Sequence, residues 1–185
     1  PPMPQWQEPG EYVGDARAGQ VHVVSPHPYW RLHSQMNNSE RLRKRYTVQT
    51  REPLTISVED AKAHGIQDGD LVELYNNRGA VVVGARVSDK IMPGVVSLYE
   101  GAWPQLDSKG RCNNGLINFL TSSRRSSGLT QATTANTCIA SIRKCTDADP
   151  GGTKAFEPPK VVPSKITFDE KFYGLERAVV LREKA

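Results

Sequence analysis

Residues 65–79 read GIQDGDLVELYNNRG, and this stretch decides the fold. Its middle part, residues 71–75, has the apolar and aromatic composition of a short strand. Residues 67–70 turn the chain into that strand, and residues 76–79 tolerate positive φ. We therefore expect a hairpin that returns along residues 80–87.

A short helix is expected directly upstream of this hairpin. Ser57 is a favourable N-cap, and Glu59 and Asp60 follow in the first turn, where the helix dipole favours carboxylates. Gly65 then ends the helix about two turns after it began.

Other short apolar and β-branched segments continue the strand pattern on both sides. We expect strands at residues 21–24, 46–50, 54–56, 95–99 and 137–143. Short strands at a spacing of about 8–12 residues, with one brief helix, indicate a compact β-barrel with helical additions and not a doubly wound sheet.

Length and composition describe one domain with polar ends. The 185 residues suffice for a single core, and no apolar run approaches the roughly 18 residues of a membrane helix. The chain opens Pro-Pro-Met-Pro without an initiator methionine, so we expect a piece of a larger protein. Cys112, Cys138 and Cys145 are odd in number and lack CxxC spacing, which predicts neither a disulfide framework nor a zinc site.

The net charge of +4 is unevenly distributed. One short region has a single acidic residue, Glu40, against six basic residues, which are Arg31, Arg41, Arg43, Lys44, Arg45 and Arg51. Such a run most often forms a solvated face, and nucleic-acid binding is the usual functional interpretation. No aromatic-rich strand signature supports RNA binding here, and an anionic small molecule or an acidic neighbouring domain fits as well.

The segment SPHPYWRLHSQ, residues 25–35, follows the first expected strand and concentrates hydrogen-bond donors. Imidazole and guanidinium groups donate to phosphate, Ser and Gln add neutral donors, and the prolines stiffen the loop. The alternative is a polar surface loop. His-x5-His spacing without a third ligand is a weak metal signal, so anion contact ranks above metal ligation.

These motifs together resemble a known family. Residues 54–103 combine the helix, the D-G-D and N-x-R-G turns, I-x-P-G-V-V and Gly-Ala-Trp, and residues 118–136 contain N-F-L-T, Ser-Gly and Q-A-T-T-A-N. With the 25–35 loop, this order resembles the C-terminal molybdopterin-dinucleotide-binding domain of the dimethyl-sulfoxide-reductase family. The similarity is greatest to the trimethylamine-N-oxide and biotin-sulfoxide reductase branch, and it covers roughly residues 20–157.

The resemblance implies a mainly β fold with short helices, a double-psi β-barrel with extended termini. The barrel domain would occupy residues 21–157, between an N-terminal arm (1–20) and a C-terminal tail (158–185), of which residues 165–185 are expected to dock as a strand or short helix. It would hold bis(molybdopterin guanine dinucleotide)-molybdenum, shared with upstream domains. The implied contacts are Ser25, His27, Arg31, His33, Ser34, Gln35, Asn118, Gln131 and Thr133, with the backbone amides of Gly101 and Ala102.

The resemblance also implies an enzyme of which this chain is a part. In the branch, a serine from an upstream domain ligates the metal, and no motif for it is present here, so we expect no catalytic or metal-ligating residue and no activity of the isolated domain. The parent would reduce N-oxides or S-oxides, most directly trimethylamine N-oxide. Its electron donor would be a c-type cytochrome, and its compartment the periplasm, with the cytoplasm as second choice.

Such a barrel has three competing interpretations. A self-processing decarboxylase needs a Gly-Ser bond, and none of the 15 glycines is followed by serine. A protein-adaptor module needs no phosphate-binding loop and would leave residues 25–35 unexplained. A nucleic-acid-binding module rests on the basic cluster at 41–45, and salt-dependent DNA binding would distinguish it. We do not expect nucleic acid as the partner.

Overall fold

The computed structural model describes residues 3, 5–6, 8–128 and 132–151. Strands outnumber helices among them, and the helices are short. In chain order the elements are η1 (Val13–Asp15), β1 (Gln20–Val24), α1 (Glu40–Tyr46), β2 (Pro53–Ser57), α2 (Val58–Ala63), β3 (Leu71–Tyr75), β4 (Ala80–Ser88), β5 (Val95–Leu98), η2 (Ile117–Phe119) and β6 (Ile139–Lys144).

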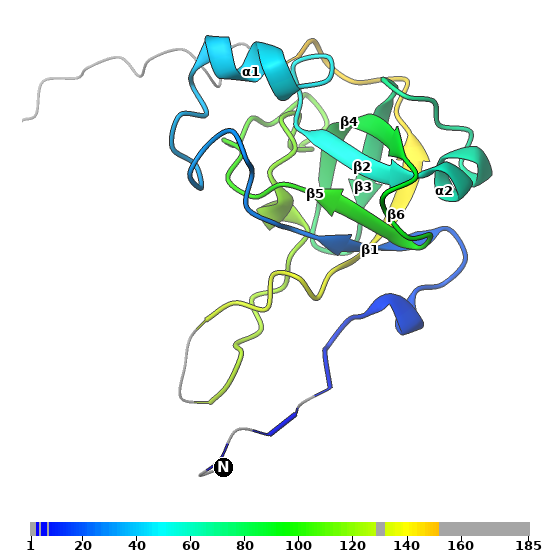
Figure 1. The fold of residues 1–185 in the computed structure, drawn as a ribbon, viewed down its shortest axis with the longest axis vertical. Helices are drawn as coiled ribbons and strands as arrows, with labels where there is room; N and C mark the ends of the chain where they lie inside the picture. Colours follow the sequence, from blue (N-terminus) through cyan, green and yellow to red (C-terminus); the bar gives the residue numbers. More distant parts are fainter. Residues whose placement is uncertain (1–2, 4, 7, 129–131, 152–185) are drawn as a thin grey trace, which may run out of the picture.

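The six strands close into a barrel in the order β1-β5-β2-β4-β3-β6 (Figure 1). The β1–β5 and β2–β4 pairs are parallel, and the other neighbours are antiparallel. The predicted hairpin is the β3–β4 pair, in which Tyr75 lies opposite Ala80. This architecture confirms the expected double-psi β-barrel.

The core lies inside the barrel and draws on every strand. Fully buried side chains include Val23 of β1, Leu54 of β2, Leu74 of β3, Val83 of β4 and Leu98 of β5. Each such side chain contributes about 1.5–3 kcal/mol through its removal from water. The core therefore stabilises the barrel and leaves the connecting loops to carry polar groups.

The predicted cap of α2 is confirmed. The Ser57 hydroxyl oxygen accepts from the Asp60 backbone N–H at 3.0 Å and its hydroxyl donates to Asp60 Oδ2 at 2.8 Å. Asp60 Oδ2 also accepts from the Gly94 N–H at 2.8 Å, which ties the helix to the turn before β5. Gly65 adopts a φ of +63° after the helix end, as its expected role requires.

The expected strand at residues 46–50 is wrong. Tyr46 instead ends helix α1, and residues 48 and 51 form only an isolated bridge around Gln49 and Thr50, which both have positive φ. The helix is favoured by good helix formers and by an i,i+4 ion pair between Glu40 and Lys44. Tertiary burial of Tyr46, which is 1% exposed, outweighs the local strand composition.

The basic run does not form one solvated face. Arg31, Arg43 and Arg51 are buried, whereas the other basic members of the run are exposed. The three cysteines are all buried and free. No helix within the described part of the chain is long and apolar enough to cross a membrane.

The N-terminal arm is anchored to the barrel by one carboxylate. Glu11 accepts two hydrogen bonds from Arg78 at 2.6 and 2.9 Å and one from the Ile139 N–H at 2.6 Å. The expected C-terminal tail, residues 158–185, and the predicted docking of residues 165–185 lie outside the described residues.

Candidate functional site

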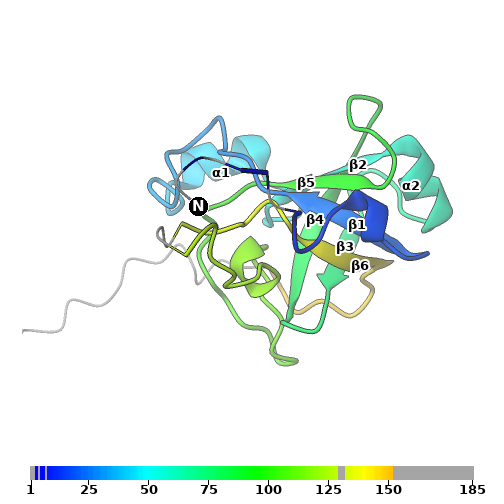
Figure 2. The same ribbon diagram turned by 90° about the horizontal axis from the view of Figure 1, so that it is seen from below.

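Three loops gather at one end of the barrel. Because β1 and β5 are parallel neighbours, the loops that follow them leave the same edge. In both views these loops and the excursion described over residues 120–128 and 132–136 lie on the side of the barrel away from α2 (Figures 1 and 2). The Ser25 N–H donates to Asn136 Oδ1 at 2.6 Å, and the Glu100 N–H donates to the Pro26 carbonyl at 3.2 Å. These bonds hold the three loops together.

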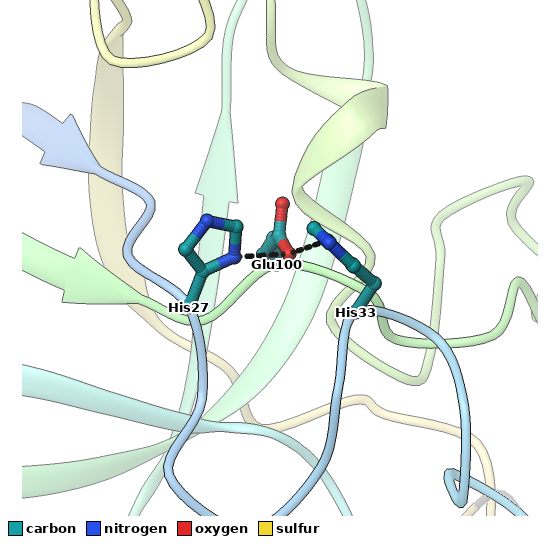
Figure 3. A group of neighbouring side chains, drawn as sticks. All are labelled: His27, His33 and Glu100. Carbon is teal, nitrogen blue, oxygen red and sulfur yellow. Dashed lines mark hydrogen bonds and ion pairs between the residues drawn. The ribbon is translucent and has the colours of Figure 1, made fainter.

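Two predicted histidines meet on a carboxylate at this edge. Nδ1 of His27 and Nδ1 of His33 lie 2.7 and 2.6 Å from the same oxygen, Glu100 Oε1 (Figure 3). The two rings are edge to face, with centroids 4.8 Å apart. The side chains of His27 and His33 are 72% and 60% exposed, and that of Glu100 is 30% exposed. Because Nδ1 of each ring is engaged, Nε2 is the ring nitrogen available to a ligand.

The ionisation of Glu100 is shaped by this contact. Partial burial by itself would raise its pKa, but the hydrogen bonds from His27 and His33 and their positive charge outweigh burial. The pKa of Glu100 therefore lies below the usual glutamate value. The carboxylate is thus held in the charged form that accepts from both rings.

Arg31 lies inside the protein and supports the loop. Its Nε donates to the His33 carbonyl at 3.0 Å and its Nη2 to the Glu100 carbonyl. Its Nη1 donates to Glu52 at 3.1 and 3.2 Å and to the Tyr46 hydroxyl at 3.0 Å. The resemblance implies a ligand contact for Arg31, whereas the structure gives its guanidinium these internal partners.

A buried ionic cluster lies beneath the loop at residues 25–35. We call it the Glu52 cluster, and its members are Glu52, Arg31, Arg43, Tyr46 and Asn37. Glu52 is 0% exposed and accepts from both guanidiniums, with Arg43 Nη1 at 3.3 Å. Burial raises the pKa of Glu52, against the effect of both arginines, and burial lowers the pKa of Arg43. Asn37 Oδ1 accepts from Arg43 at 2.9 Å, which joins the end of the loop to α1.

The segment after β5 packs against the same loop. Gly101 has a φ of +82°, and a Cβ there would lie 2.2 Å from the His33 carbonyl oxygen. Trp103 Nε1 donates to the Ser34 carbonyl at 2.9 Å, and Ala102 is buried. The expected contact of the Gly101 backbone amide with a ligand stays a prediction, and the structure shows that the missing side chain of Gly101 leaves room for the loop backbone.

The other predicted contacts that the structure describes lie on the first loop, on η2 and in the excursion that follows η2. Ser34 and Gln35 are exposed, and among the described residues no hydrogen bond engages either side chain. Asn118 is exposed on η2, and Thr133 is exposed and bridges to the backbone of residue 125. Gln131 lies outside the described residues.

Sequence reasoning missed three residues of this region: Glu100, Asn136 and Glu52. Asn136 ends the Q-A-T-T-A-N motif and Glu100 directly precedes Gly-Ala-Trp, but the resemblance implies a role for neither. A signal for Glu100 does exist, because it follows a strand and precedes a glycine. That signal becomes useful only once β5 is known to run parallel to β1.

Two bacterial reductases are similar to most of this chain. It is 43% identical over 165 residues to the trimethylamine-N-oxide reductase of Haemophilus influenzae, a match that covers 86% of this chain and 20% of the relative. It is 41% identical to the dimethyl sulfoxide/trimethylamine N-oxide reductase of Cereibacter sphaeroides, again over 86% of this chain and 20% of that protein. The chain therefore spans about a fifth of the length of these relatives.

A solved structure and a family model agree with the architecture. Acetylene hydratase from Pelobacter acetylenicus superposes with a TM-score of 0.61 at 12% identity, over 78% of this chain and 21% of the other, which shows the fold alone. The family model described as "Molydopterin dinucleotide binding domain" matches residues 21–139, which include both histidines, Glu100 and Asn118. The chain belongs to the molybdopterin dinucleotide-binding domain family.

Proposed function

We propose that this chain holds bis(molybdopterin guanine dinucleotide)-molybdenum for a reductase of N-oxides or S-oxides, with trimethylamine N-oxide as the first candidate substrate. The observation that carries the proposal is the histidine pair on Glu100, exposed where three loops of the barrel meet. The similarity to trimethylamine-N-oxide and dimethyl sulfoxide reductases supports the reaction class.

The donor set fits a ligand with pyrophosphates and polar ring edges. His27 and His33 present Nε2, which donates to a phosphate oxygen when the ring is protonated. The hydroxyl of Ser34 and the amide of Gln35 are exposed on the same loop. Asn118, which is exposed on η2, offers an amide that can pair with a guanine edge.

These exposed donors indicate what the cofactor and what the chain contribute to the reaction. The cofactor supplies two-electron oxygen-atom-transfer chemistry when it is bound. The residues of this chain bind and orient it, and we assign none of them a catalytic role. We therefore propose that the isolated chain is inactive and that activity belongs to the larger parent.

Upstream domains of the parent are the proposed partners at this edge. Tyr29, Leu32 and Met36 are 90%, 63% and 57% exposed on the loop that carries the histidines. Apolar side chains of this size grouped on one loop favour coverage by protein. We further propose a periplasmic parent that receives electrons from a c-type cytochrome. Nucleic acid is not proposed, because three arginines of the basic run are buried.

The test is an NMR titration of the 185-residue chain with GDP. We expect weak binding, with a Kd on the order of 1 mM because only one wall of the site is present, and shifts in residues 25–35 and 118–133. The double variant His27→Ala with His33→Ala should weaken binding further. His64→Ala, at the end of α2 opposite the loops, is the matched control and should bind as the wild type does. Shifts confined to other segments would show that the site is misplaced.

A further inference from the structure

We propose that Glu100 is a positioning residue that fixes how His27 and His33 face the ligand. By accepting a hydrogen bond from Nδ1 of each ring, its Oε1 turns both Nε2 atoms outward. The role as a support for cofactor binding rests on the proposed function. The orientation of the rings is independent of it.

The geometry requires a common anchor for the two rings. His27 and His33 are 72% and 60% exposed, so side-chain packing alone does not select one rotamer for either. Both nevertheless direct Nδ1 to one oxygen, and they lie edge to face at 85°. A single carboxylate oxygen has two lone pairs, so it can accept from both rings at once.

Glu100 is itself held firmly from two sides. Its N–H donates to the Pro26 carbonyl, and its carbonyl accepts from Arg31, which Glu52 holds from below. The next residue, Gly101, abuts the His33 carbonyl. The backbone of Glu100 is therefore fixed relative to both halves of the loop that carries the histidines, and its carboxylate reaches the two rings from this fixed position.

This contact determines the chemistry that the rings offer. A carboxylate at Nδ1 keeps a proton on that nitrogen, so a neutral ring has an accepting Nε2 and a protonated ring has a donating Nε2. The lowered pKa of Glu100 agrees with this direction of hydrogen bonding. Imidazoles that ligate metals are oriented by carboxylates in the same way.

The first readout is the tautomer of each histidine, observed by long-range ¹H–¹⁵N NMR on the 185-residue chain without any ligand. The chain has four histidines, so His22 and His64, which do not contact Glu100, serve as internal references. We expect His27 and His33 to show the Nδ1–H form in the wild type and in Glu59→Ala, which removes an exposed carboxylate from α2. In Glu100→Ala both should change, while the references stay.

The second readout is GDP affinity. Loss of a negative charge by itself favours an anion, so weaker binding by Glu100→Ala identifies lost positioning. We expect affinity to fall roughly 3- to 10-fold, the factor that corresponds to one ordinary hydrogen bond. Glu100→Gln keeps a carbonyl oxygen that can accept from Nδ1–H but loses the negative charge, so it should retain more of the wild-type spectrum of the two rings than Glu100→Ala does.

The outcomes separate this proposal from the proposed function. Unchanged tautomers in Glu100→Ala would overturn the positioning role, as would unchanged or tighter GDP binding by that variant. A wild-type Nδ1 signature that disappears on addition of EDTA would also overturn it, because a metal ion and not Glu100 would then orient the rings. If the tautomers change but GDP leaves residues 25–35 unperturbed in the wild type, Glu100 positions the rings and the cofactor assignment fails.

Discussion

Glu52 and Glu100 are two carboxylates that each bind two basic side chains, one beneath the loop and the other on its surface. Glu52 is 0% exposed and accepts from Arg31 and Arg43. Glu100 is 30% exposed and lies between His27 and His33. Arg31 connects the two sites, because it binds the Glu52 carboxylate and the Glu100 carbonyl.

The difference between the two sites shows how two carboxylates with basic partners come to have different roles. Arginine stays charged and its planar fork makes several bonds at once, which suits a buried structural pair. Histidine changes its charge near neutral pH and has a second ring nitrogen, which suits a surface that meets a ligand. Burial raises the pKa of Glu52, whereas hydrogen bonds from the histidines lower that of Glu100 despite its partial burial. Burial thus makes the Glu52 site a structural support, whereas exposure leaves the Glu100 site able to meet a ligand.

The largest effect is expected from Glu52→Leu. The change leaves the guanidiniums of Arg31 and Arg43 buried without a carboxylate, and the free energy of unfolding should fall by about 3–5 kcal/mol. Urea denaturation measures the loss. Glu52→Gln, which keeps one acceptor oxygen, should lose less.

Glu40→Leu is the matched control, because Glu40 pairs with Lys44 on the exposed side of α1. It should lower the unfolding midpoint far less than Glu52→Leu does, because only an exposed i,i+4 pair is lost. A Glu52→Leu variant as stable as the wild type would mean that apolar packing replaces the cluster, and the structural role argued here would be wrong.

A smaller effect is expected from Gly101→Ala, compared with Gly65→Ala. Both glycines have positive φ, so each change costs about 1–2 kcal/mol through the left-handed backbone. Nothing lies within 4 Å of a Cβ at Gly65, whereas at Gly101 the Cβ would meet the backbone of residue 33. Gly101→Ala should therefore lose roughly 1–3 kcal/mol more and shift the signals of His33. If urea denaturation gave the same loss of unfolding free energy for both variants, the loop backbone at residue 33 would move aside without cost.

The smallest effect is expected in the pH dependence of the stability that Glu100 contributes. The folded pKa of Glu100 is lowered, so its contribution to stability is fully present above the ordinary value of 4.5 and is lost as the pH falls through the folded pKa. The gap in unfolding free energy between the wild type and Glu100→Ala should therefore shrink between about pH 6 and about pH 3. A gap that grows on acidification would contradict the assigned direction. Exposure of the side chain keeps this effect small.

The predictions that succeeded depended on neighbours in the sequence. Ser57 caps α2, and the turn at residues 76–79 joins β3 to β4, because both motifs act within a few residues. The strand expected at residues 46–50 failed because burial of Tyr46 and the ionic contacts of Arg43 stabilise a helix that ends there. Such long-range contacts leave no local pattern.

The candidate site was likewise predictable in its local features and not in its long-range contacts. By itself the sequence identified the loop at residues 25–35 as polar and donor-rich, and its motifs pointed to the family that the family model then showed. Only the tertiary structure decided that Arg31 turns inward to Glu52 while His27 and His33 turn outward on Glu100. The physical reason is that hydrogen-bonding capacity belongs to each residue, whereas burial and partners depend on the parallel β1–β5 pairing, which joins residues about 70 positions apart.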